Sequence, residues 1–327
     1  MNIVQLKLAD GTRAVGIVDG NRLALLDGVA STLDLARQAL AAGTTLASAA
    51  EKARGTRTED YQRVIDERRL LSPVDHPDPA HLLVTGTGLT HLGSAATRDA
   101  MHAVKESDLT DSMKMFKMGL EGGRPAAGGI GVQPEWFFKG DGSTVVAPEA
   151  DITMPGFSLD GGEEPEIAGI YFIADDGTPC RLGFALGNEF SDHVTERINY
   201  LFLAHSKLRL SAFGPELRLG DLPGSVEGTS AIRRGGEVVW SKPFKSGEAN
   251  MSHTLGNLEH HHFKYAAFRR PGDVHVHYFG TATLSFADGI KPQPGDRFEI
   301  GSPDFGRPLR NTLQQTPDEG LVKVRPL

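Results

Sequence analysis

Glycine and proline are spread along the whole chain and limit the length of any regular element. The 327 residues include 39 glycines and 19 prolines, and both residue types interrupt helices and favour turns. The sequence contains no collagen-like period, no low-complexity block and no convincing internal repeat. It therefore predicts short strands joined by many turns, in preference to long helices.

Beyond residue 80 the chain consists mainly of short apolar runs bounded by glycine or proline. The clearest of these runs lie at 81–84, 136–138, 167–174, 181–186, 238–240 and 274–279. Runs of this length and spacing are typical of strands in a barrel or roll. Segment 94–120 differs, because its methionines and its few strand-forming residues predict a helix and a loop. We expect this segment to form a lid over a cleft.

The first 75 residues predict a smaller unit. Apolar runs at 3–8 and 14–18 are each followed by an Asp-Gly pair, which favours hairpins. The apolar spacing after Thr32 predicts a helix that Thr32 caps, and residues 59–71 predict a second helix. Residues 72–79 hold three prolines, which end helices and are typical of a linker.

We therefore expect a β-rich α+β fold in two parts. Residues 1–75 form a small N-terminal α+β domain, and residues 80–327 form a β-rich catalytic domain with a lid at about 94–120.

Charge and hydropathy narrow the class of partner. The chain has 34 Lys and Arg against 42 Asp and Glu, so its formal net charge is -8, which argues against nucleic acid or an anionic membrane. The single cysteine excludes an intrachain disulfide framework and a four-cysteine zinc site. We find no basic start followed by an apolar run and no apolar run of about 18 residues. These features predict a cytoplasmic protein.

Three glutamates form the most informative pattern. Glu164 and Glu166 are two residues apart and would share one face of a strand. Like charges on one face are costly unless water or a cation compensates them, and a hard divalent cation does so well. A third acid, Glu189, ends a later apolar strand. The pattern predicts a Mg²⁺ or Mn²⁺ site that keeps positions open for a chelating substrate, and a solvated acidic loop is the alternative.

The order of these segments resembles the fumarylacetoacetate hydrolase superfamily. Glu164-Pro165-Glu166 corresponds to the family's metal-binding Glu-x-Glu pair, and Asn188-Glu189-Phe190-Ser191 corresponds to its Asn-Asp-Val-Ser. Further similar segments follow the family's order at 134–139, Lys207, 213–217, 271–273, 280–281, 294–296 and 305–311. The resemblance covers roughly residues 80–315. It implies a mixed β-roll domain behind a small α+β domain, a homodimer, and a Mg²⁺ or Mn²⁺ ion held by Glu164, Glu166 and Glu189.

His91 is a candidate for proton transfer. It follows an apolar run and a glycine-rich turn, an exposed position suited to a group that titrates near neutral pH. Family members often have a histidine here with a water-activating glutamate three residues later, and this chain has Ser94 at that offset. Glu106 or Glu121 of the lid would then have to supply the base for hydrolysis. A turn histidine bonded to the backbone is the alternative for His91.

Two lysines and a threonine complete the expected site. Lys207 lies where the family has a site lysine, and a nearby divalent cation would lower its pKa so that it can exchange a proton with an enolate. Lys139 could bind a substrate carboxylate or pair with Asp141. Thr281 could donate a hydrogen bond to a bound carboxylate.

Other kinds of site have weaker support. His260, His261 and His262 are consecutive, so their rings point in different directions, and with His275 and His277 they predict structural roles more than a zinc site. The sequence contains neither a full dinucleotide fingerprint nor a Gly-x-Ser-x-Gly elbow. A binding module without activity would not need all three carboxylates.

The resemblance therefore implies a metal-dependent enzyme of carbohydrate catabolism. Because Ser94 replaces the water-activating glutamate, we expect a dehydratase that converts a 2-keto-3-deoxy sugar acid, such as 2-keto-3-deoxypentonate, to 2-oxoglutarate semialdehyde through a metal-stabilised enolate. Thr87, Arg98 and Thr281 would suit its hydroxylated chain. The alternative is a C–C bond hydrolase of a 2,4-diketo acid.

Overall fold

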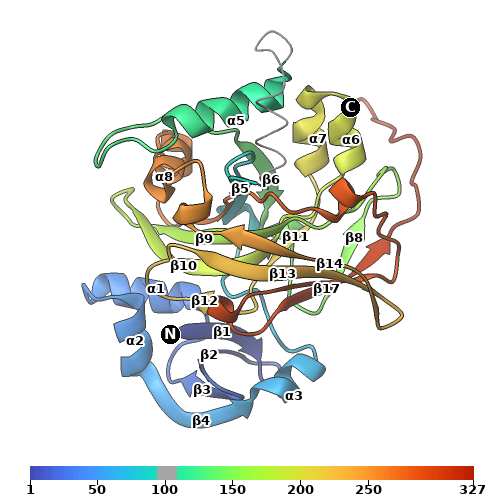
Figure 1. Cartoon of the computed structure of the whole chain (residues 1–327). Coiled ribbons are helices and arrows are strands. Elements are labelled where there is room, and N and C mark those ends of the chain that lie inside the picture. Colours follow the sequence, from blue (N-terminus) through green and yellow to red (C-terminus); the bar gives the residue numbers. More distant parts are fainter. Residues whose placement is uncertain (94–108) are drawn as a thin grey trace.

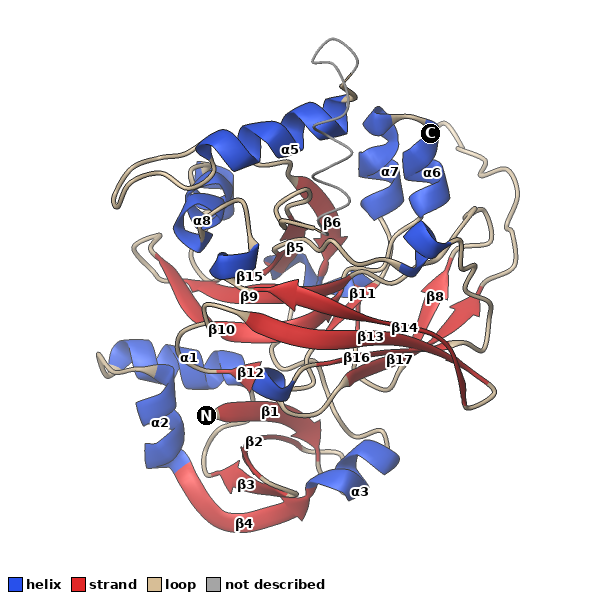
Figure 2. Ribbon diagram, viewed as in Figure 1, coloured by secondary structure: helices blue, strands red, loops and turns tan. Residues whose placement is uncertain are grey.

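The structure is a computed structural model that describes residues 1–93 and 109–327. Two β-sheets form the centre of the molecule (Figure 1). The larger sheet has twelve strands and the smaller sheet has five. Helices cover the sheets on the outside (Figure 2). The architecture is a β-rich α+β fold, as the sequence predicts.

The larger sheet runs through both parts of the chain. Its strands, in spatial order, are β4 (Arg54–Asp60), β3 (Arg22–Leu26), β2 (Arg13–Asp19), β1 (Asn2–Lys7), β12 (Leu217–Arg218), β10 (Pro179–Asn188), β9 (Pro165–Ile173), β15 (Val274–Tyr278), β5 (Leu82–Gly86) and β6 (Phe137–Asp141). Beside this path, β11 (Ser211–Phe213) pairs with β10 and with β7 (Val145–Val146). The smaller sheet has the order β14 (Glu237–Ser246), β13 (Val226–Arg234), β16 (Arg297–Gly301), β17 (Leu309–Gln315) and β8 (Asp151–Met154).

The helices are short, as the glycine and proline content predicts. The α-helices are α1 (Thr32–Ala41), α2 (Leu46–Ala53), α3 (Tyr61–Asp66), α5 (Asp111–Gly122), α6 (His193–Ile198), α7 (Leu203–Lys207) and α8 (Leu255–Phe263). Single 3₁₀ turns are η1 (Pro79–His81), η3 (Gly142–Thr144), η4 (Tyr200–Phe202), η5 (Glu248–Asn250), η6 (Ala266–Phe268), η7 (Ser285–Asp288) and η8 (Pro303–Phe305). In the described part of the chain, every helix is too short or too polar to cross a lipid bilayer.

The N-terminal predictions need two corrections. Ser31, not Thr32, caps α1, because its hydroxyl accepts a hydrogen bond from the Asp34 amide at 3.0 Å. The helix expected at 59–71 is only α3, since β4 continues to Asp60. Arg68 has a positive φ of 52° and interrupts any further helix.

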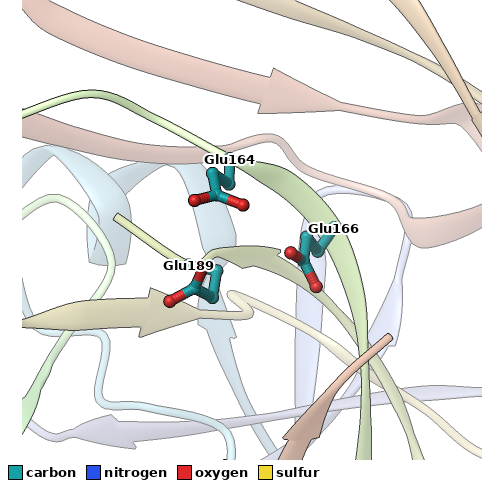
Figure 3. A group of neighbouring side chains, drawn as sticks. All are labelled: Glu164, Glu166 and Glu189. Atoms are coloured by element: carbon teal, nitrogen blue, oxygen red, sulfur yellow. The ribbon is translucent and has the colours of Figure 1, made fainter. Parts of the chain in front are cut away.

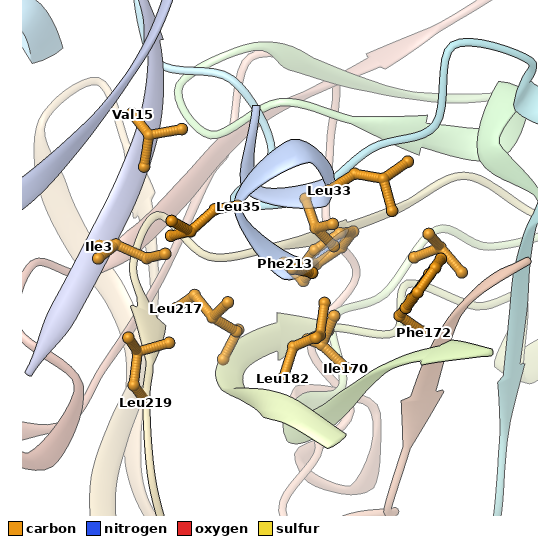
Figure 4. Close-up of a cluster of buried hydrophobic side chains, with 14 of the residues drawn as sticks. Ile3, Val15, Leu33, Leu35, Ile170, Phe172, Leu182, Phe213, Leu217 and Leu219 are labelled. Carbon is orange, nitrogen blue, oxygen red and sulfur yellow. The ribbon is translucent and has the colours of Figure 1, made fainter. Parts of the chain in front are cut away.

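The two parts of the chain share a sheet and a core. Ile3 of β1 pairs with Leu217 of β12, and one apolar cluster contains Ile3 together with Ile170 and Phe213 (Figure 4). This packing fixes the N-terminal strands against the sheet that carries the site. The domain boundary that we expect between residues 75 and 80 remains a prediction.

Candidate active site

Three buried glutamates meet where β9 begins and β10 ends (Figure 3). Glu164 directly precedes β9, Glu166 lies on it, and Glu189 directly follows β10. The pairing of β9 with β10 places Glu166 opposite Gly187, and the Glu189 amide donates to the Glu164 carbonyl at 3.1 Å. One carboxylate oxygen from each residue lies within 4.8 Å of the others.

Burial makes this cluster electrostatically costly. Glu164 is 8% exposed, Glu166 1% and Glu189 0%, so little water screens their mutual repulsion. Burial, together with Glu189 and Glu164, raises the pKa of Glu166 well above its usual range. Burial and the charge of Glu164 raise the pKa of Glu189 to about 7.

Glu164 differs from the other two because its pKa is lowered. Burial alone would raise its pKa, but Lys207 and His193 outweigh burial and hold the pKa of Glu164 well below its usual range. His193 Nε2 lies 3.2 Å from Glu164 Oε1, and its Nδ1 lies 3.3 Å from Asp160 Oδ2. Although burial opposes it, these two carboxylates raise the pKa of His193 to about 10.

Lys207 lies between two of the carboxylates. Its ammonium contacts Glu164 Oε1 and lies 2.5 Å from Glu189 Oε2. The same group lies 4.9 Å from the centroid of the Phe137 ring. Although burial opposes it, the two glutamates raise the pKa of Lys207 well above its usual range. From the sequence we expect a lower pKa for Lys207, because we assume a divalent cation next to the ammonium.

The donor set fits a hard divalent cation. Among the described residues, Glu166 has no ion-pair partner, and its Oε2 accepts one hydrogen bond, from the Gly280 amide at 2.6 Å. Three carboxylates with one uncompensated member suit Mg²⁺ or Mn²⁺, which prefer oxygen ligands. In the described ranges, these glutamates are the only group of three or more acidic, histidine or cysteine side chains close enough to share an ion.

Lys139 pairs with Glu189, whereas the sequence predicts a substrate carboxylate or Asp141 as its partner. Its buried ammonium lies 2.6 Å from Glu189 Oε1 and donates to the carbonyls of Phe190 at 2.6 Å and Lys207 at 3.1 Å. These three acceptors use all three of its donors. Asp141 instead accepts hydrogen bonds from Ser143. The structure thus leaves Lys139 no free donor for a substrate carboxylate.

His91 is buried, so the expected exposed position is wrong. It is 4% exposed, its Nε2 lies 2.9 Å from Ser246 Oγ, and its Nδ1 lies 3.0 Å from Thr90 Oγ1. Burial lowers the pKa of His91 to about 4, so the ring is neutral at physiological pH. An isolated antiparallel β-bridge also pairs His91 with Met251.

Two predicted threonines lie close to the same loop. The Thr87 hydroxyl donates to the Tyr278 carbonyl at 3.3 Å, and Thr281 directly follows Gly280. Gly280 has a φ of 98°, and a Cβ there would overlap the Thr90 hydroxyl. Only glycine therefore lets the backbone turn here and present its amide to Glu166.

Part of the predicted lid falls outside the described residues. Ser94, Arg98 and Glu106 lie there, so the structure gives them no position. Residues 111–122 form α5, and Glu121 lies on that helix, where its carboxylate pairs with Lys117 at 3.8 Å.

Glu135 is a candidate that the sequence reasoning missed. Glu135 is 8% exposed, and its carboxylate accepts a hydrogen bond from the Tyr200 hydroxyl at 2.8 Å. Burial raises its pKa, although Tyr200 and the nearby charge of Lys207 act against this. A Cβ at Gly88 would overlap Glu135 Oε1. Glu135, Phe137 and Lys139 alternate along an extended segment, and this period of two was the signal that could have placed all three on the site's face.

Three of the histidines that the sequence singles out, His262, His275 and His277, contact one another. His262 Nε2 lies 3.0 Å from His275 Nδ1, and His277 Nδ1 lies 2.7 Å from Thr85 Oγ1. The ring of His262 also stacks on that of His277 at a centroid distance of 4.5 Å. The contacts of His262 join α8 to β15, and the contact of His277 with Thr85 joins β15 to β5.

The whole architecture is similar to that of several solved enzymes. A 2-keto-3-deoxy-D-arabinonate dehydratase in its apo form has a TM-score of 0.71 and 20% identity, over 97% of this chain and 100% of that chain. A 2-keto-3-deoxy-D-arabinonate dehydratase complexed with magnesium and 2,5-dioxopentanoate has a TM-score of 0.70 and 19% identity over the same shares. A 5-carboxymethyl-2-hydroxymuconate delta-isomerase from Mycobacterium smegmatis has a TM-score of 0.58 and 17% identity, again over 97% and 100%.

These likenesses establish the fold. No family model and no curated protein sequence matches the chain. The fold is nevertheless that of the fumarylacetoacetate hydrolase superfamily, which the order of sequence motifs predicts.

Proposed function

We propose that the chain is a divalent-metal-dependent lyase that removes water from a 2-keto-3-deoxy sugar acid. The buried cluster of Glu164, Glu166 and Glu189, with Lys207 against two of its members, carries this proposal. A 2-oxo acid presents a carboxylate and a neighbouring carbonyl oxygen, and hard cations bind both. The fold shared with a dehydratase complexed with magnesium and 2,5-dioxopentanoate supports the same choice.

The three glutamates would hold Mg²⁺ or Mn²⁺. When bound, the cation supplies Lewis acidity, which makes the C3 protons of a 2-oxo acid more acidic. Lys207 can accept a proton only when Glu164 and Glu189 are otherwise compensated, because their charges raise its pKa.

Lys207 and Glu135 provide a base and an acid for elimination. Lys207 Nζ takes the proton from C3, and the electrons of the C3–H bond form the C3=C4 double bond. As the C4–O bond breaks, Glu135 donates its proton, and the hydroxyl leaves as water. Burial raises the pKa of Glu135, so this carboxyl is suited to hold a proton for the leaving group. For a pentonate, tautomerisation then gives the aldehyde at C5.

His91 and Lys139 act indirectly in this proposal. His91 packs against the loop that presents Gly280, whose amide holds Glu166. Lys139 fixes Glu189 through its ion pair. Thr281, next to Gly280, remains a candidate donor to the substrate carboxylate.

The test is direct turnover. Incubation with Mg²⁺ and 2-keto-3-deoxypentonate should yield 2-oxoglutarate semialdehyde, detected by mass spectrometry as the loss of one water. Chelation of the metal should abolish the product, and so should Lys207→Met. The matched control is Lys291→Met, which changes an exposed lysine outside the proposed site. This variant should retain activity.

The same assay can overturn the proposal. If no such acid is turned over and a 2,4-diketo acid is cleaved into two shorter acids, the chain is a C–C bond hydrolase. Metal-independent turnover would contradict the role of the three glutamates.

A further inference from the structure

His193 contacts the carboxylate cluster, and the proposed reaction gives it no role. It is 6% exposed and is the first residue of α6. Its Nε2 lies 3.2 Å from Glu164 Oε1, and its Nδ1 lies 3.3 Å from Asp160 Oδ2. The ring therefore links a candidate metal ligand to a second carboxylate that lies outside the cluster.

The antiparallel pairing of β9 with β10 brings these three residues together. The pairing continues past both strands, because the backbones of Gly162 and Ser191 exchange two hydrogen bonds of 3.0 Å each. Two residues further along each segment, Asp160 comes opposite His193. Side chains two residues apart in an extended segment share one face. Asp160, Gly162 and Glu164 therefore lie on the face that the ring contacts.

Gly162 leaves the space that the ring occupies. A Cβ at this position would lie 2.7 Å from Nδ1 and 2.8 Å from Cε1 of the His193 ring. These distances are shorter than a van der Waals contact, so any side chain here would displace the ring. The sequence Asp160-x-Gly162-x-Glu164 thus provides two hydrogen-bond acceptors with a gap between them.

The contacts of His193 also affect which oxygen of Glu164 remains available. The imidazole and the Lys207 ammonium both bind Oε1. In the described part of the chain, Glu164 Oε2 accepts no hydrogen bond. An ionised carboxylate can accept at both oxygens, so Oε2 is left for a cation.

The ring of His193 reaches the loop that binds Glu166 as well. It stacks on the ring of Phe286 with a centroid distance of 5.2 Å and an angle of 23° between the planes. Phe286 lies on η7, which follows the turn at Gly280, and the Gly280 amide donates to Glu166 Oε2 at 2.6 Å. His193 is therefore in contact with the side chain of Glu164 and with the loop that binds Glu166.

We propose that His193 is a positioning residue, which together with Asp160 fixes the Glu164 carboxylate so that Oε2 stays available to a cation. Groups that hydrogen-bond to a metal ligand hold it in one orientation and raise the affinity for the metal. Without the imidazole, Lys207 would hold Oε1 alone among the described residues, and the carboxylate could turn. The inference rests on the metal site of the proposed function but does not depend on which substrate is dehydrated.

Isothermal titration with Mg²⁺ tests this role. We expect His193→Phe, which keeps a ring against Phe286 but has no donor, to raise the Mg²⁺ dissociation constant by about tenfold or more. Gly162→Ala keeps the histidine but displaces its ring, so it should also weaken binding. Gly256→Ala is the matched control, because a Cβ there meets no described atom within 4 Å, and it should bind Mg²⁺ normally. Circular dichroism should show that all three variants remain folded.

A double-mutant cycle separates positioning from a general loss of structure. Glu164→Asp shortens the side chain and moves its carboxylate away from His193. If His193 acts through Glu164, His193→Phe should weaken Mg²⁺ binding by a smaller factor in the Glu164→Asp background than in the wild type. Equal factors in both backgrounds would overturn the proposal.

The titrations also distinguish failure of this role from failure of the metal site. A wild-type protein that does not bind Mg²⁺ would overturn the proposed metal site and the role of His193 together. Normal Mg²⁺ affinity in both His193→Phe and Gly162→Ala would overturn the role of His193 alone.

Discussion

Glu166 differs from its two neighbours because no cation compensates its charge within the described residues. Glu164 and Glu189 share Lys207, whereas Glu166 accepts only the Gly280 amide. This asymmetry makes Glu166 the carboxylate that gains most from a bound metal.

Glu166→Gln should therefore abolish divalent-ion binding and activity while the fold persists. The amide keeps the shape of the side chain but removes the charge that compensates the cation. Isothermal titration with Mg²⁺ checks this, and circular dichroism checks the fold. Glu164→Gln should have the same effect on binding. If either variant binds Mg²⁺ and turns over normally, the assignment of the metal site is wrong.

Tyr200 should set the pH range over which Glu135 holds its proton. Its hydroxyl donates to Glu135, which stabilises the charged carboxylate and lowers its pKa. Tyr200→Phe removes this donor, so the pKa of Glu135 rises further. If protonated Glu135 is the acid, activity falls as pH rises through this pKa, and the variant moves that limb of the profile to higher pH.

The measurement is kcat against pH for both proteins. Glu135, Tyr200 and Tyr265 line one cavity of 360 Å³. Tyr265→Phe serves as the control, because Tyr265 lines this cavity without a hydrogen bond to Glu135. An unchanged alkaline limb in Tyr200→Phe would remove Glu135 from the role of acid.

At the scale of elements, α5 packs closely through a glycine. Gly119 is buried, and a Cβ there would lie 2.8 Å from His253 Nε2. Gly256 near the start of α8 has open space around it. Replacing either glycine by alanine reduces the entropy that the backbone loses on folding. A difference in stability between the two variants therefore reports the packing of the added methyl group.

We expect Gly256→Ala to raise the free energy of unfolding by roughly 0.5–1 kcal/mol. Gly119→Ala should instead lower it by about 1 kcal/mol, because the new methyl group overlaps the ring of His253. Urea denaturation of both variants measures this difference. Equal stabilisation by both substitutions would show that α5 does not pack on His253.

For the whole molecule, metal binding and protonation compete for the same carboxylates. The pKa values of Glu166 and Glu189 are raised, in Glu189 to about 7, so the folded chain without metal binds more protons than the unfolded chain above the usual glutamate pKa. The contribution of these two carboxylates to stability therefore falls as pH rises through this window. A divalent cation binds the deprotonated forms and opposes that loss.

Mg²⁺ should therefore raise the melting temperature more at about pH 8 than at about pH 5.5. Scanning fluorimetry with and without saturating Mg²⁺ measures both shifts. Glu166→Gln is the control and should lose the shift at both pH values. A larger shift at the lower pH would contradict competition with protons.

Much of the fold follows from local sequence. The alternating and short apolar runs specify β5, β6, β9, β10, β14 and β15, because strand formation needs a pattern of period two and turn residues at its ends. The pair Glu164 and Glu166 follows from the same period. The ends of α1 and α3 were missed, since capping by Ser31 and the end of β4 depend on single hydrogen bonds and on pairing with β3.

The sequence by itself determined the strands, the carboxylate pair and the superfamily's order of motifs. Tertiary structure decided the rest of the site. His91 is buried with its ring against Ser246, Lys139 pairs with Glu189 rather than with Asp141, and Glu135 contacts Tyr200, 65 residues away in the chain. These outcomes depend on which distant segments pack together, and burial then sets their charge states. The periodic pattern of apolar residues along the sequence does not predict such long-range contacts.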